Sequence, residues 1–122
     1  MIRAKPLPKA LGKMLVSKLP YSSLKYRNSV KEQNCIACIV PTSPCHAHHV
    51  RSLWPTTMGR RVSDYLCVPL CDIHHDVHPG SLHKHGGEAE WWKLMGINPA
   101  QWIASFSVGG RKIISQIEGM NA

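Results

Sequence analysis

The chain of 122 residues lacks long apolar runs and internal repeats. A membrane-spanning helix needs about 20 consecutive apolar residues, and the runs here are only a few residues long, so we expect no membrane segment. The N-terminal sequence MIRAKPLPKALGKMLVSKLP also lacks the pattern of a secretory signal. These absences argue against a membrane or secreted protein.

Acidic residues are scarce, because 7 Asp and Glu stand against 15 Lys and Arg, which gives a formal net charge of +8. Basic side chains gain free energy when they displace counterions from phosphates. The charge balance therefore favours a polyanionic partner, with nucleic acid as the first candidate.

The cysteines do not form the pattern of a disulfide framework, since there are five of them at irregular spacings. Eight histidines accompany them, and this combination favours metal chemistry in a reducing compartment. We expect a cytoplasmic protein, in a bacterial host cell if the sequence comes from a phage or prophage.

Proline placement divides the chain into two parts. Pro6, Pro8 and Pro20 block a continuous helix in residues 1–20, which we expect to be a basic, extended N-terminal arm. Residues 21–122 are long enough for one small domain, for which a bound metal would help stability. We predict an α+β fold.

Short elements are expected along that domain. A helix over residues 22–33 offers Leu24, Tyr26 and Val30 as core contacts. Strands over 47–51 and 65–68 could pair across a long loop that contains Gly59. Three further helices are predicted over 72–78, 87–96 and 98–107, the last with Asn98 as its cap and Pro99 in its first turn.

Two short-spaced pairs of ligand residues indicate a closed tetrahedral zinc site. Cys35 and Cys38 form Cys-x-x-Cys, and Cys71 with His74 forms Cys-x-x-His. The alternatives are ordinary buried cysteines or a redox pair, although the βαβ setting of thioredoxin-like motifs is missing. Cys45 and Cys67 have no such spacing and are expected to be core or loop thiols, with Cys45 near enough to the first pair to substitute as a ligand.

Histidines remain in surplus around this zinc site, because a structural zinc uses four ligands. Residues 46–49 read His-Ala-His-His, and His75 and His78 follow His74. His83 and His85 stand in a Gly-flanked stretch and are expected to be exposed loop residues, with DNA contact or metal binding as lesser alternatives. Trp91, Trp92 and Trp102 occupy helical positions that favour core packing over base stacking.

The motif order resembles the HNH nucleases of the ββα-metal type. Cys-x-x-Cys is followed by His48-His49, where the family usually has Asp-His, and then by LCDIHH at residues 70–75. Within that group, AHHVR, VSDYLCVPLCDIHHDVHPG and the Trp91-Trp92 pair are similar to the phage-borne recombination enhancement (Ref-like) nucleases. The resemblance covers about Asn34 to Trp102.

The resemblance implies a β-hairpin and helix that grip one divalent cation, beside a zinc that joins hairpin to helix. His49 takes the position of the general base, and His48 and His75 take metal-ligand positions. His78, three residues after His75, is an additional candidate ligand of the same cation. The zinc ligands are Cys35, Cys38, Cys71 and His74. The catalytic cation would be Mg²⁺, Mn²⁺ or another divalent transition metal. Imidazole ligands prefer transition metals to Mg²⁺.

Two points of this mapping stay open. The middle asparagine of the family falls near Leu66, where Asp64 is the nearby polar residue; a turn-forming role for Asp64 is the alternative. In a rival scheme, His74 and His78 at i,i+4 join His48 on the catalytic cation, which leaves the three cysteines without a fourth partner.

The sequence thus predicts an α+β domain with an HNH ββα-metal core that acts as a DNA endonuclease. The family resemblance also implies DNA bound by a recombinase filament as a substrate. The competing class is a nonenzymatic zinc-binding module that holds nucleic acid or protein. Candidate phosphate contacts are Arg51, Arg60, Arg61 and, in the arm, Arg3, Lys5, Lys9, Lys13 and Lys18.

Overall fold

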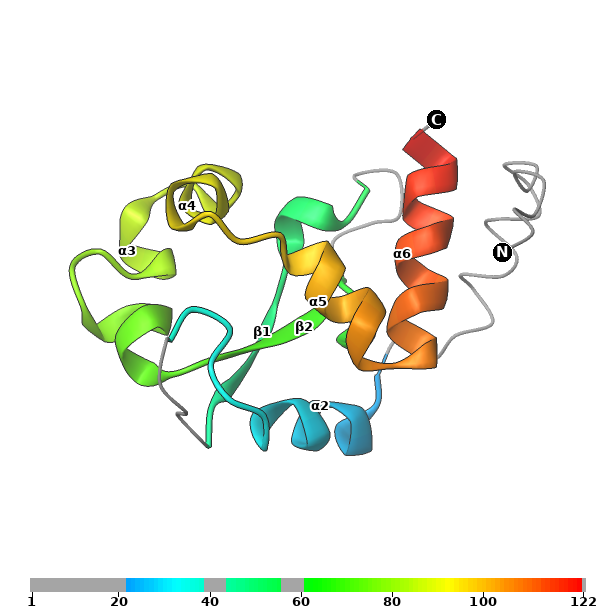
Figure 1. The fold of residues 1–122 in the computed structure, drawn as a ribbon, viewed down its shortest axis with the longest axis horizontal. Helices are drawn as coiled ribbons and strands as arrows, with labels where there is room; N and C mark the ends of the chain where they lie inside the picture. Colours follow the sequence, from blue (N-terminus) through cyan, green and yellow to red (C-terminus); the bar gives the residue numbers. More distant parts are fainter. Residues whose placement is uncertain (1–21, 39–43, 56–60, 122) are drawn as a thin grey trace.

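The computed structural model describes residues 22–38, 44–55 and 61–121. Within these ranges the fold is α+β, with five α-helices and one two-stranded antiparallel sheet (Figure 1). The expected arm of residues 1–20 lies outside the described ranges, as does Gly59. None of the helices described is long and apolar enough to cross a membrane.

The sheet is a hairpin of β1 (His46–His49) and β2 (Cys67–Leu70), with His46 opposite Leu70 and His49 opposite Cys67. Both strands were predicted, but each is displaced by one or two residues. Strand β1 ends at His49, so Val50 lies between it and the 3-10 turn η1 (Arg51–Leu53). A second 3-10 turn, η3 (Asp64–Leu66), directly precedes β2. Successive side chains alternate across a strand, so His48 and His49 point to opposite faces of β1.

The helix α2 (Leu24–Lys31) is shorter than the predicted 22–33. Ser23 caps it, since its side chain accepts a hydrogen bond from Tyr26 N. Tyr26 and Val30 are buried as expected, whereas Leu24 is 61% exposed, contrary to the prediction. Positions 24 and 26 are separated by about 200° around an α-helix, so both cannot face the sheet.

The predicted helix over 87–96 is confirmed as α4 (Glu88–Met95), which ends at Gly96 with φ 69°. Trp91 and Trp92 are buried in it, as predicted. The preceding segment was expected to be a loop but forms a short helix, α3 (Leu82–His85), which carries His83. Gly86 ends α3 with φ 91°, a conformation that glycine adopts without steric cost.

The last two helices pack against each other. In α5 (Pro99–Phe106), Asn98 caps the N-terminus and Pro99 begins the first turn, as predicted. Trp102 of α5 is half-buried and stacks on Phe106. The helix α6 (Val108–Asn121) was not predicted. It buries one isoleucine-rich face, formed by Ile113, Ile114 and Ile117.

The hairpin lies at the centre of the fold (Figure 1). Helix α2 packs against both strands, and α5 packs against β2 while pairing with α6. Helices α3 and α4 lie at the other end, where α3 contacts the helical turn η4 (Ile73–Val77) that follows β2. This arrangement leaves one face of β1 turned toward η4 and α3.

Candidate functional site

Cys35, Cys38, Cys71 and His74 come together in one cluster, as the sequence predicted. His74 Nδ1 lies 3.7, 3.3 and 3.2 Å from the sulfurs of Cys35, Cys38 and Cys71, in that order. The sulfurs of Cys38 and Cys71 are 3.6 Å apart, far beyond the length of a disulfide, about 2.05 Å. The structure shows no disulfide among its described cysteines.

These separations fit a tetrahedral metal site. With zinc about 2.3 Å from sulfur and about 2.05 Å from nitrogen, donors on a tetrahedron lie about 3.6 to 3.8 Å apart. Burial raises the pKa of the Cys35 thiol to about 12, so this thiol needs a bound cation to ionise near neutral pH. The four residues could therefore hold a metal ion such as zinc.

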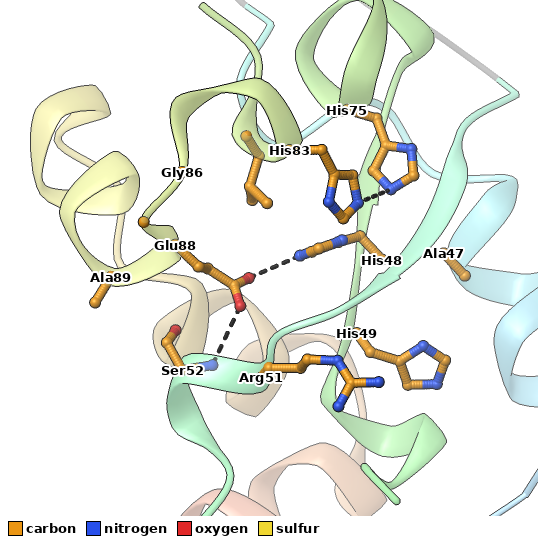
Figure 2. A pocket seen from close by; sticks show the side chains of 12 residues that line it. Ala47, His48, His49, Arg51, Ser52, His75, His83, Gly86, Glu88 and Ala89 are labelled. Atoms are coloured by element: carbon orange, nitrogen blue, oxygen red, sulfur yellow. Dashed lines mark hydrogen bonds and ion pairs between the residues drawn. The ribbon is translucent and has the colours of Figure 1, made fainter. Parts of the chain in front are cut away.

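The geometry of η4 explains why His74 and His75 face different sites. The segment, predicted as a short helix, is a π-helix, and His78 N bonds Ile73 O at 3.2 Å. Single π turns in proteins often occur at functional sites. In this turn His74 points to the cysteines, while His75 points to β1 and α3 (Figure 2).

His78 does not join the histidines of the neighbouring site. It precedes Pro79, which disfavours helical dihedral angles at the residue before it, and it adopts φ −75° and ψ 144°. Its Nδ1 accepts a hydrogen bond from Gly80 N at 2.9 Å. The predicted helix over 72–78 thus ends at Val77, and the rival scheme with His74 and His78 on one helix face does not match this geometry.

A second cluster is formed by His48 of β1, His75 of η4 and His83 of α3. One nitrogen from each lies within 4.8 Å of the others, and the Nε2 atoms of His75 and His83 are 3.0 Å apart. The three side chains lie close together in Figure 2, among the residues that line an open pocket with a volume of about 690 Å³. His83 is exposed, as expected, but it lies on α3 rather than in a loop and takes the place predicted for His78.

The donor chemistry of this cluster suits a divalent cation. Two nitrogens about 2.1 Å from one ion lie about 3.0 Å apart on an octahedron and about 3.4 Å apart on a tetrahedron. The pKa of His75 is lowered to about 4, mainly by burial and to a smaller extent by the neighbouring His48, His83 and His46. His75 is therefore neutral at pH 7, and its ring keeps a lone pair for a metal.

His49 lies on the other side of β1 and is held by Asp64. Its Nε2 is 2.8 Å from Asp64 Oδ1. The other carboxylate oxygen accepts a hydrogen bond from Ser23 N at 2.7 Å and pairs with Arg27 Nε at 3.1 Å. An ionised carboxylate only accepts, so His49 Nε2 carries the proton and Nδ1 is left with the lone pair.

Glu88 is a site residue that the sequence did not predict. It stands in the first turn of α4, with Oε2 2.7 Å from Nε2 of His48 (Figure 2). The two residues are 40 positions apart, and no local pattern around Glu88 marks it. His83 did have a sequence signal, since it lies eight residues after His75 in a histidine-rich stretch.

A short hydrogen-bonded contact joins His46 to Asp72 at the edge of this site. The ring of His46 stacks on that of His75, with centroids 4.8 Å apart and 23° between the planes. His46 is exposed and does not belong to the group of three.

The remaining thiols are buried, as expected. Cys67 is fully buried in a small cluster with Tyr26 and Val30. Its sulfur lies near donor atoms of His49 and Asp64, but burial and then the charge of Asp64 raise its pKa to about 12. His49 and Asp64 already bond each other, and Asp64 is also held by Ser23 and Arg27, so these three residues are better explained as a hydrogen-bonded pair beside a core cysteine. Cys45 is also buried and lies outside the described metal-ligand groups.

Of the predicted phosphate contacts, Arg51 lines the pocket beside His48 and His49 (Figure 2). Arg61 is exposed and its guanidinium donates to the hydroxyl of Ser22. The other candidates, Arg60, Arg3, Lys5, Lys9, Lys13 and Lys18, lie outside the described residues.

Comparison with protein-family models gives no match, and comparison with curated proteins and with solved structures gives no significant match. The resemblance to the HNH group therefore rests on the sequence motifs alone.

Proposed function

We propose that the protein is a metal-dependent DNA endonuclease of the HNH type. The observation that carries this proposal is the convergence of His48, His75 and His83 on one open pocket that Arg51 also lines, with His49 next to His48 on the opposite face of β1. A nonenzymatic zinc-binding module needs the Cys₃His cluster but has no use for a second group of three histidines. The surplus of basic residues over the whole chain is suited to a DNA substrate.

The order of elements supports the same proposal. A β-hairpin is followed directly by the helical turn η4, and ligand residues of both candidate metal sites lie on that turn. This is the arrangement that the motif resemblance implies, with a zinc of structural function in the Cys₃His cluster and a catalytic cation at the three histidines. Three imidazoles favour Mn²⁺ or another transition metal over Mg²⁺.

His49 is the general base in this proposal. Asp64 keeps the proton on Nε2, so Nδ1 can accept a proton from water near pH 7. The water oxygen forms a bond to phosphorus, its proton passes to Nδ1, and the bond from phosphorus to the leaving sugar oxygen breaks. Asp64 thus has a positioning role in place of the family's asparagine.

The phosphate needs positive charge around it, because its oxygens repel an attacking nucleophile. A divalent cation held by the three histidines would neutralise charge on the phosphate and on the leaving oxygen. Arg51 adds a guanidinium at the wall of the same pocket, where it can bind a phosphate oxygen. Both groups act on the phosphate, while His49 acts on water.

The direct test is nicking of supercoiled plasmid DNA by the zinc-loaded protein. The reaction is run with Mg²⁺ or Mn²⁺, each with and without a recombinase filament on the DNA, since the resemblance implies such a filament as a substrate. We expect nicking with Mn²⁺ at least, in one of the two DNA forms. No cleavage in any of the four conditions would leave the zinc-binding module as the better explanation.

A further inference from the structure

Glu88 reaches the three-histidine site from outside the hairpin and η4. Its carboxylate comes from the N-terminal turn of α4 and lies on the opposite side of His48 from His75 and His83 (Figure 2). Oε2 is 2.7 Å from His48 Nε2, and the side chains of the two residues are only 16% and 7% exposed. A carboxylate and an imidazole so well shielded from water interact strongly.

The surroundings of Glu88 hold its carboxylate in one orientation. Oε1 accepts a hydrogen bond from Ser52 N at 3.2 Å, and Oε2 also accepts one from Trp92 Nε1 at 3.4 Å. Oε1 and Oε2 both serve as acceptors in these contacts, so the carboxylate meets N–H donors with each of its oxygens.

A carboxylate that faces an imidazole nitrogen fixes the tautomer of that ring. Because Glu88 can only accept, His48 Nε2 must carry the proton, and Nδ1 keeps the lone pair. Metal-binding histidines commonly donate their second ring N–H to a carboxylate, which orients the ring and makes the ligand nitrogen more basic.

We propose that Glu88 is a positioning residue for the cation site, which sets the tautomer and ring orientation of His48 for metal binding. This inference rests on the proposed cation at His48, His75 and His83, and it adds a fourth side chain, from α4, to the groups that determine the affinity of that site. It also gives α4 a functional role, since the helix carries the carboxylate that completes the hydrogen bonding of His48.

The test is calorimetric titration of Co²⁺ into protein that already holds one zinc per chain, without DNA. The variants are Glu88→Ala, Glu88→Gln and, as a matched control, Glu90→Gln, which changes an exposed glutamate of the same helical turn. We expect Glu88→Ala to weaken Co²⁺ binding about 10- to 100-fold. Glu88→Gln keeps an acceptor oxygen without the charge and should lose less, and Glu90→Gln should bind as the wild type does.

Thermal unfolding of the same variants without Co²⁺ separates positioning from simple support of α4. If Glu88→Ala and Glu88→Gln lower the unfolding midpoint but bind Co²⁺ as tightly as the wild type, the carboxylate is only structural and the inference is wrong. Tighter binding in either variant would mean that Glu88 competes with the cation for His48, which also overturns it. If Glu88→Ala does not fold, the affinity of Glu88→Gln decides.

Failure of the proposed nuclease function has a different signature. A wild-type protein that binds Co²⁺ in a Glu88-dependent manner but never nicks DNA would contradict the nuclease and leave the role of Glu88 intact. If the wild type nicks DNA and the Glu88 variants bind Co²⁺ as tightly as the wild type does, the inference about Glu88 is wrong and the nuclease proposal stands. Co²⁺ binding that His48→Ala leaves unchanged would place the cation elsewhere and overturn the inference about Glu88.

Discussion

Removal of one cysteine from the Cys₃His cluster should destabilise the whole fold. Cys71 belongs both to this cluster and to the main hydrophobic core, and the cluster joins the Cys35–Cys38 segment to η4. Structural zinc contributes roughly 10–16 kcal/mol of apparent binding energy in small zinc domains. The total stability of a protein domain is only about 5–15 kcal/mol, so zinc binding could supply most of it.

The expected size of the effect follows from the four ligands. Divided evenly, the binding energy assigns about 2.5–4 kcal/mol to each donor. For a chain of this length, 1 kcal/mol shifts the unfolding midpoint by about 3–5 °C. Cys71→Ala should therefore lower the midpoint by roughly 10 °C or more, or prevent folding, and reduce bound zinc from one per chain toward none.

The matched control is Cys45→Ala, which removes a thiol that is buried to a similar degree (8% exposed against 6% for Cys71) but lies outside the described metal clusters. This change should cost about 1 kcal/mol and leave zinc content unchanged. The assays are elemental analysis of the purified proteins and thermal unfolding followed by circular dichroism, with and without a chelator. A Cys71→Ala protein with no bound metal and the wild-type midpoint would refute the reasoning.

Three further predictions concern single positions. Asp64→Asn should slow DNA nicking by on the order of 10²-fold or more, because an amide N–H opposite His49 Nε2 would reverse the tautomer; wild-type nicking would contradict the positioning role. His83→Ala should raise the Mn²⁺ concentration needed for half-maximal nicking at least about tenfold, so an unchanged requirement would remove His83 from the site. Gly110→Ala should lower the free energy of unfolding by about 1–3 kcal/mol, because its Cβ would lie 2.2 Å from a backbone oxygen of α5. In Gly119→Ala, the matched control in α6, the Cβ meets no atom within 4 Å, so denaturant unfolding should show equal or greater stability.

The sequence predicted the Cys₃His cluster because each half of it is local. Cys35 and Cys38 lie on one turn and Cys71 and His74 on another, so pairing of the two strands brings the halves together. Helices with clear end signals were also predicted well, such as α5 with its Asn98 cap and α4 between two glycines.

The second site was predicted less completely because it depends on tertiary structure. Pro79 turns His78 away, and the short helix α3 brings His83 back to His75. Glu88 meets His48 only through the packing of α4 against η1. Helix α6 was missed because its two glycines near the start weaken the helical signal, although Gly109 and Gly110 allow close packing of α6 on η3 and α5.

The central claim is that His49 takes a proton from water during cleavage of DNA. The measurement that tests it most directly is the rate of plasmid nicking in Mn²⁺ by His49→Ala, beside His85→Ala as a control for loss of an exposed imidazole on α3. We expect His49→Ala to lose about 10²-fold or more of the rate, with zinc content, unfolding midpoint and DNA affinity unchanged, while His85→Ala nicks at the wild-type rate. Nicking by His49→Ala at the wild-type rate would contradict the account.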